Sequence, residues 1–121
     1  MLRLFLAVTP AALLLSVAIF VLMTVNGFAC DQVTIASYYG TESGSVTSNG
    51  EHFDGTSMTA ASRTLPFGTR LRVTYRGKSV VVRVNDRGPY IRGRSLDLSR
   101  AAAERIGLIH AGVGLVCVGR L

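Results

Sequence analysis

Histidine and cysteine are scarce in this sequence of 121 residues, which contains two of each. His52 and His110 are far apart, and no Cys/His cluster has the spacing of zinc ligands. The Gly-x-Ser-x-Gly pattern of a serine-hydrolase elbow is absent, and no glycine-rich phosphate loop opens a predicted helix. The sequence therefore predicts no metal site, no cofactor and no nucleophilic serine of the hydrolase type.

Acidic residues are also few, since seven aspartates and glutamates stand against thirteen lysines and arginines. Only Arg3 of these charged residues precedes Cys30, so the chain from Cys30 onward carries about +5. Anionic lipids or acidic polymers could bind such a charge, but no aromatic-and-basic pattern indicates nucleic acid. Many arginines occupy polar strand positions, where an ordinary solvated face explains them.

Charge is absent from the stretch between Leu4 and Ala29, which follows a short positive start. Residues 1–29 are therefore interpreted as a signal peptide that is cleaved before Cys30, or as an uncleaved anchor that holds the protein on a membrane. A lipoprotein signal is a third interpretation, although Gly27 stands where such signals have an aliphatic residue. Each interpretation implies that residues 30–121 are exported.

The two cysteines stand near the ends of this exported part, because Cys30 opens it and Cys117 lies in its last predicted strand. In an oxidising compartment they are expected to form one disulfide. Closing so long a loop contributes about 4–5 kcal/mol in the chain-entropy model, which matters because a domain of about ninety residues buries limited apolar surface. Lipidation of Cys30 is the alternative, since a thioether leaves no thiol.

Alternating apolar and polar residues predict one β-rich domain over residues 30–121, with one short helix. Ser99 is the expected N-cap of that helix, alanines 101–103 favour it, and Gly107 ends it. Arg76-Gly77 is expected to form a tight hairpin. Strands are predicted over residues 34–39, 59–62, 70–75, 79–86 and 112–118.

The stretch from Ser79 to Pro89 is expected to be a strand that delivers one carboxylate, Asp86, to the mouth of a loop. Valines at every second position give the period of a half-buried strand, and Gly88-Pro89 ends it. A carboxylate on a rigid strand end can act as an acid or a base. The simpler interpretation is an aspartate that caps a turn and pairs with Arg87.

Glu51 and Asp54 lie in a Ser/Gly/Asn-rich connection over residues 41–55, which is uncommonly long unless it is functional. Carboxylates in an exported domain point to glycosidic bonds, where one acid protonates the leaving oxygen. The simpler interpretation is that Glu51 and Asp54 only solvate the loop. Asp97, two residues before Ser99, is expected to be structural, bonded to the helix N-terminus or to a buried arginine.

Six segments of the sequence matter here together, namely residues 36–40, 47–54, 59–62, 64–69, 80–89 and 96–99. In this order they resemble the rare lipoprotein A family, the septal-ring lytic transglycosylases, across Thr34 to Val118. Single segments are weak signals, but six in order are specific. The resemblance implies a six-stranded double-psi β-barrel, shared with expansin-like and barwin-like domains. It also implies bacterial peptidoglycan as substrate, with preference for peptide-stripped strands, and a place in the periplasm or cell envelope.

The resemblance also implies roles for individual residues. Asp86 matches the aspartate proposed as the catalytic acid/base, and Glu51 and Asp54 match acidic residues of the groove. Ser62 stands where the family usually has histidine, and a serine cannot carry a proton near neutral pH as histidine can. The residues expected to bind substrate are Tyr39, Asn49, Ser62 and Arg87.

The sequence thus predicts an exported peptidoglycan lytic transglycosylase that leaves 1,6-anhydro-muramic ends, with Asp86 acting as acid and then as base. An acid must keep its proton near neutral pH, so the Arg87 guanidinium is expected to point away from Asp86. The alternative is a non-catalytic, expansin-like module that binds peptidoglycan, which Ser62 favours. A third candidate is a secreted inhibitor or interaction protein, which would have a groove too shallow for sugar.

Overall fold

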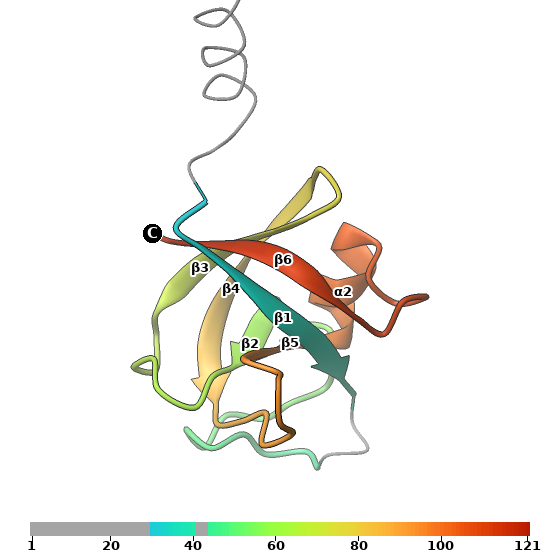
Figure 1. Cartoon of the computed structure of the whole chain (residues 1–121). Helices are drawn as coiled ribbons and strands as arrows, with labels where there is room; N and C mark the ends of the chain where they lie inside the picture. The colour runs from blue at the N-terminus through green and yellow to red at the C-terminus, as the bar shows by residue number, and fades with distance from the viewer. Residues whose placement is uncertain (1–29, 41–43) are drawn as a thin grey trace, which may run out of the picture.

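The computed structural model describes residues 30–40 and 44–121, in which six strands close into a barrel and one short helix packs against it (Figure 1). The predicted mainly-β barrel with one helix is confirmed. The predicted signal or anchor, residues 1–29, lies outside the described residues. The elements are β1 (Gln32–Tyr39), β2 (Thr59–Ala61), β3 (Arg70–Tyr75), β4 (Lys78–Asp86), β5 (Leu96–Ser99), α2 (Arg100–Ile106) and β6 (Val113–Arg120).

The strands follow one another around the barrel in the order β1-β5-β2-β4-β3-β6. Two pairs, β1 with β5 and β2 with β4, are parallel, and the other four neighbouring pairs are antiparallel. This is the double-psi β-barrel that the family resemblance implied. Strands far apart in sequence thus become neighbours, and their ends bring distant loops together.

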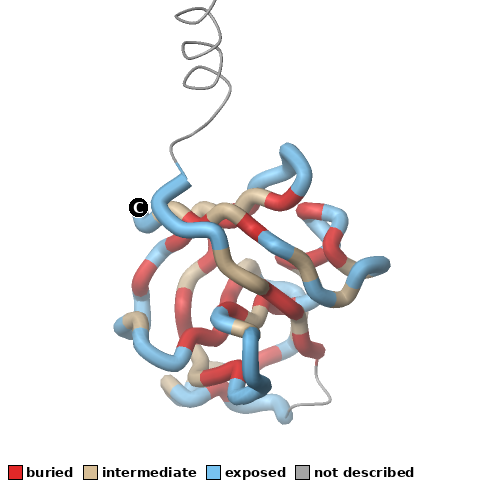
Figure 2. Tube along the Cα trace, in the orientation of Figure 1, coloured by how far each residue is buried: buried red, intermediate tan, exposed pale blue. Residues whose placement is uncertain are grey.

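The barrel interior is filled from alternate positions of the strands, as the period of two requires. On β3 the inward side chains are Leu71, Val73 and Tyr75, as predicted, and all three are buried. The β4 valines at positions 80, 82 and 84 are buried as well. Buried positions alternate with intermediate ones along β3 and β4, and Figure 2 shows buried, intermediate and exposed positions along the chain. Burying each such valine or leucine contributes about 1.5–3 kcal/mol.

Local signals end the elements where the sequence indicated. The Ser99 hydroxyl accepts a hydrogen bond from the Ala102 amide, and Gly107 ends α2 with a positive φ of 76°. Arg76 and Gly77 have φ of 48° and 84°, the two positive values of a type I′ turn that matches the twist of β3 and β4. The predicted caps and hairpin are therefore confirmed.

Cys30 and Cys117 form a disulfide, with their Cα atoms 5.4 Å apart across 87 positions of sequence. It ties the start of the described chain to β6, beside the C-terminus (Figure 1). Within residues 30–40 and 44–121, no helix combines the length and apolar character needed to cross a membrane.

Candidate active site

A pocket of about 470 Å³ is lined mainly by residues of the connections before β2 and after β4. These connections gather at the end of the barrel opposite the β3–β4 hairpin (Figure 1). Two carboxylates, Asp86 and Asp97, line it together with the phenol of Tyr39. Val46, Tyr90 and Ile91 also line it, and these three apolar side chains are exposed. The pocket therefore joins acidic groups to apolar surface.

Strand pairing places the two carboxylates on either side of β2. Ala61 is the Cα partner of Asp86 on β4 and of Asp97 on β5, and Asp97 in turn pairs with Ser37 on β1. Paired residues project to the same side of a sheet. Four neighbouring strands thus hold one row of side chains, which explains why Asp86 and Asp97 meet in one pocket although 11 positions of sequence separate them.

Asp86 is held by a set of hydrogen bonds that use its two oxygens unequally. Oδ1 accepts from the Ser48 amide at 3.0 Å, the Ser48 hydroxyl at 2.6 Å and the Arg87 amide at 2.8 Å. From the described residues, Oδ2 accepts one hydrogen bond, from the Tyr39 hydroxyl at 3.4 Å. Oδ1 therefore fixes the orientation of the carboxyl group, and Oδ2 remains the oxygen able to exchange a proton with a ligand.

Tyr39 is a buried residue whose ring stacks on Phe53, with ring centroids 4.9 Å apart. Burial raises the pKa of its hydroxyl above the ordinary tyrosine value, and the negative charges of Asp86 and Asp97 raise it further. The phenol therefore stays protonated and donates to Asp86. Tyr38, its neighbour, instead donates to the Ile109 carbonyl at 3.4 Å.

The Arg87 side chain turns away from Asp86, as expected. Its guanidinium donates to the carbonyls of Ser62 and Leu65 at 3.0 and 2.8 Å and lies 3.9 Å above the centre of the Phe67 ring. Arg87 lines the pocket, but these contacts occupy its charged end. Its contribution in the structure is to hold the 62–67 turn against the end of β4.

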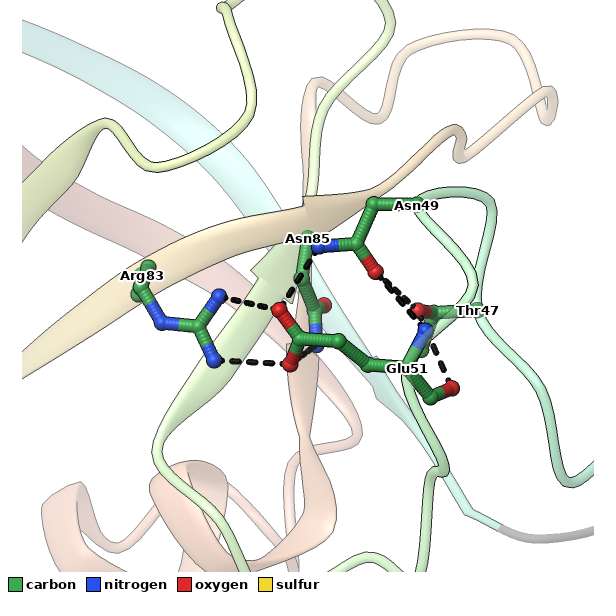
Figure 3. A network of polar contacts seen from close by, with 5 residues as sticks. All are labelled: Thr47, Asn49, Glu51, Arg83 and Asn85. Carbon is green, nitrogen blue, oxygen red and sulfur yellow. Dashed lines mark hydrogen bonds and ion pairs between the residues drawn. The ribbon is translucent and has the colours of Figure 1, made fainter.

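Glu51 lies in a polar network that fastens its loop to β4 (Figure 3). Its carboxylate forms a two-pronged ion pair with Arg83, at 2.6 and 2.8 Å, and accepts from the Asn49 amide group at 2.7 Å. These hydrogen bonds, led by the one from Arg83, lower the pKa of Glu51 to about 2. Glu51 is thus ionised at neutral pH, unlike a general acid, and it positions the loop whose Ser48 contacts Asp86.

Asn49 completes this network rather than facing the pocket. Its side-chain oxygen accepts from the Thr47 hydroxyl at 2.6 Å and from the Glu51 amide at 3.1 Å. Its backbone amide donates to the Asn85 carbonyl at 3.3 Å. Asn49 therefore fixes the turn beside Ser48, and its expected contact with substrate stays a prediction.

The structure does not bring Asp54 or Ser62 into the pocket of Asp86. Asp54 accepts from the Thr56 amide and hydroxyl, which lower its pKa, and it lines a separate hollow beside α2. The Ser62 side chain is buried, and its oxygen accepts from the amides of Thr64 and Leu65. Both side chains cap local turns, which explains why they point away from the pocket that the resemblance assigned to them.

Sequence reasoning missed Asp97 and Ser48 as residues of this pocket. Asp97 was expected to be structural, but Ser99 caps α2, while the Asp97 carboxylate accepts from the Ser37 hydroxyl at 2.8 Å and lines the pocket. The period of two along β5 could have indicated that Asp97 faces opposite to the buried Leu96 and Leu98. Within the described residues, no three His, Cys, Asp or Glu side chains gather to hold a metal ion.

The protein belongs to the class of closed double-psi β-barrels, and a pocket lined by two carboxylates lies at the end of the barrel where the loops gather. Two solved structures share the fold: Streptomyces papain inhibitor (TM-score 0.59, 21% identity, 78% of this chain and all of that one) and cerato-platanin 3 from M. perniciosa (TM-score 0.56, 15% identity, 74% and 94%). At these identities the likeness concerns the fold alone.

Residues 31–118 match the family model described as lytic transglycolase, and the chain belongs to this family. A probable endolytic peptidoglycan transglycosylase RlpA from Synechocystis is 55% identical over 87 residues, which are 69% of this chain and 27% of that protein. The endolytic peptidoglycan transglycosylase RlpA of Vibrio cholerae is 55% identical over 84 residues, 67% and 32% of the two chains. The resemblance to rare lipoprotein A is confirmed, and the chain spans less than a third of these relatives' length.

Proposed function

We propose that this domain is an exported lytic transglycosylase that cleaves peptidoglycan between N-acetylmuramic acid and N-acetylglucosamine. The observation that carries the proposal is the Asp86 carboxyl group, fixed through Oδ1 by Ser48 and opposed in the same pocket by Asp97. Relatives named as peptidoglycan transglycosylases, 55% identical over this domain, support the substrate class. The N-terminal uncharged stretch supports export.

In the first step, protonated Asp86 gives its proton from Oδ2 to the glycosidic oxygen, and the bond from that oxygen to muramic C1 breaks. Positive charge develops at C1. The carboxylate of Asp97 lines the same pocket, and its negative charge stabilises this transition state. Tyr39 supports Asp86 as it becomes a carboxylate, because its hydroxyl is a donor aimed at Oδ2.

In the second step, ionised Asp86 takes the proton of the muramic C6 hydroxyl, and that oxygen bonds to C1. The product is a 1,6-anhydro ring, and Asp86 is protonated again. One carboxyl group serves both steps because the nucleophile belongs to the substrate and no water has to be activated. The unequal use of its oxygens suits this role, since Oδ1 keeps the group oriented while Oδ2 exchanges the proton.

The rim of the pocket supports a sugar polymer as the ligand. Tyr90 is 78% exposed, Val46 66% and Ile91 56%, although large apolar side chains gain nothing from standing in water. The faces of sugar rings carry C–H groups that pack on such side chains, while their hydroxyls reach the carboxylates below. These three residues are therefore proposed to contact the glycan at the rim of the pocket.

The test measures products from peptide-stripped peptidoglycan with the wild-type protein and with Asp86→Asn. Mass spectrometry of the wild-type digest is expected to find 1,6-anhydro-muramic ends. The asparagine keeps the side-chain shape but cannot exchange the proton, so the rate should fall about 10²- to 10⁴-fold. Unchanged product formation by Asp86→Asn would refute the assignment of Asp86.

A second candidate is a module that binds peptidoglycan without cutting it. It is favoured by Ser62, which stands at the usual histidine position with its hydroxyl oxygen engaged by two backbone amides. Among the described residues that line the pocket, none is a histidine. Retention on the glycan with no anhydro product at any pH would support this candidate over the enzyme.

A further inference from the structure

We propose that Arg94 forms a carboxylate-binding subsite beside Asp86 and Asp97, and that it pairs with the free lactyl carboxylate of a muramic residue. This inference rests on the proposed function and deepens it. Arg94 would thus be the residue that distinguishes a glycan strand with free lactyl groups from a glycan strand whose lactyl groups carry peptides.

Two arginines line the pocket, Arg87 and Arg94, and they differ in what their guanidinium groups do. The guanidinium of Arg87 is occupied by two backbone carbonyls and the Phe67 ring. The guanidinium of Arg94 makes no hydrogen bond or ion pair in the part of the chain that the structure describes, residues 30–40 and 44–121. Arg94 is therefore the cation of this pocket that remains available to a ligand.

The backbone of Arg94 is held firmly by hydrogen bonds within its own loop and to Arg63. The Arg94 amide donates to the Ile91 carbonyl at 3.2 Å. The Arg94 carbonyl accepts from the Arg63 guanidinium at 2.7 Å, and the same nitrogen of Arg63 donates to the Pro89 carbonyl. Arg63 thus fastens both ends of the 89–94 loop, so the Arg94 side chain extends from a fixed point at the edge of the pocket.

The pocket's own charge indicates the chemistry of this ligand. The carboxylate of Asp97 repels any anion that enters the pocket, so an acidic substrate requires a cation that offsets it. Guanidinium matches a carboxylate with two parallel hydrogen bonds, a geometry that also orients the bound group. Each muramic residue carries a lactyl group that ends in a carboxylate when free and in a neutral amide when a peptide is attached. N-acetylglucosamine offers no such anion.

The experiment compares glycan strands that have free lactyl carboxylates with the same strands after their carboxylates are coupled to methylamine. Four proteins are assayed for kcat/KM: the wild type, Arg94→Gln, Arg94→Lys and Arg92→Gln. Arg92 is the matched control, because it is an exposed arginine of the same loop that does not line the pocket. Melting curves of all four proteins check that each variant folds.

The wild type and Arg92→Gln are expected to prefer the free strands by about tenfold or more, as one charge-assisted pair provides. Arg94→Gln should lower the rate on free strands to within a few-fold of that on amidated strands. Arg94→Lys should keep part of the preference, since lysine keeps the positive charge but lacks the two parallel N–H donors of guanidinium. A wild type without preference, or an Arg94→Gln protein that keeps it, would overturn the proposal.

Failure of the proposed function gives a different result, namely no anhydro product from either strand with the wild type. In that case N-acetylmuramic acid and its methylamide serve as binding probes in NMR titrations. Tighter binding of the acid by the wild type but not by Arg94→Gln upholds the subsite on a binding module. Equal binding of the two probes by the wild type refutes the subsite as well.

Discussion

Replacing Tyr39 with phenylalanine tests whether the phenol supports Asp86 during the reaction. The change deletes one hydroxyl, which donates to Asp86 Oδ2 at 3.4 Å. It keeps the buried ring and its stacking on Phe53 at 4.9 Å. The variant should therefore fold like the wild type, with a free energy of unfolding changed by about 1 kcal/mol or less.

The effect on the rate follows from the length and charge of this bond. Hydrogen bonds to charged groups contribute about 1.5–3 kcal/mol, and 3.4 Å is beyond the usual range, so the lower end applies. About 1.5 kcal/mol of lost transition-state stabilisation corresponds to a rate about tenfold lower. Burial and the neighbouring carboxylates raise the pKa of Tyr39. The hydroxyl therefore keeps its proton below the ordinary tyrosine pKa of about 10, and the deficit should be constant between about pH 5 and 9.

The assay measures release of anhydro-muramic products across that pH range, with Tyr38→Phe as the control. Tyr38 lies on the same strand and also donates at 3.4 Å, but to the Ile109 carbonyl and outside the pocket. Its phenylalanine variant should keep the wild-type rate. The reasoning is wrong if Tyr39→Phe is as fast as the wild type, or if both variants slow by the same factor.

Two further predictions concern stability. Above about pH 4.5, Glu51→Gln should have a lower melting temperature than the wild type. This difference in melting temperature should close as pH falls through about 2, because the lowered pKa of Glu51 stabilises the fold only while the carboxylate is ionised. A gap that widens in acid would contradict this, and Glu104→Gln, at a surface pair, should change little at any pH. Ser99→Ala should lower the free energy of unfolding, measured in urea, by about 2 kcal/mol, because the fully buried hydroxyl caps α2 at Ala102. The control Ser95→Ala, at an exposed serine, should lower it by less than about 0.5 kcal/mol. Equal losses in the two variants would refute the capping role.

Much of the fold could be predicted because its signals are local. The alternation of β3 and β4, the Arg76-Gly77 turn and the caps at Ser99 and Gly107 each depend on a few consecutive residues. Strand ends were less exact: the last strand was expected over residues 112–118 and runs over Val113–Arg120. Pairing with β3 extends it beyond the apolar pattern, since backbone hydrogen bonds do not require apolar side chains.

The candidate site was predicted less well, because local patterns do not show which turns face one pocket. Glu51 was expected among the catalytic groups, and that role stays a prediction; its two-pronged pair with Arg83, 32 positions away, which supports its loop, was not foreseen. Asp97 was expected to bond the helix N-terminus or a buried arginine, and the sequence did not indicate that β-pairing places it across Ala61 from Asp86.

The sequence by itself determined the family and the strand pattern, and it predicted Asp86 as the carboxylate at the end of β4. It did so because motif order, period and turn residues are properties of the chain read in one dimension. Only the tertiary structure decided that Asp97 and Arg94 share the pocket with Asp86 while Asp54 and Ser62 do not. The physical reason is the double-psi topology, whose parallel pairs β1–β5 and β2–β4 join distant segments and so assemble the pocket.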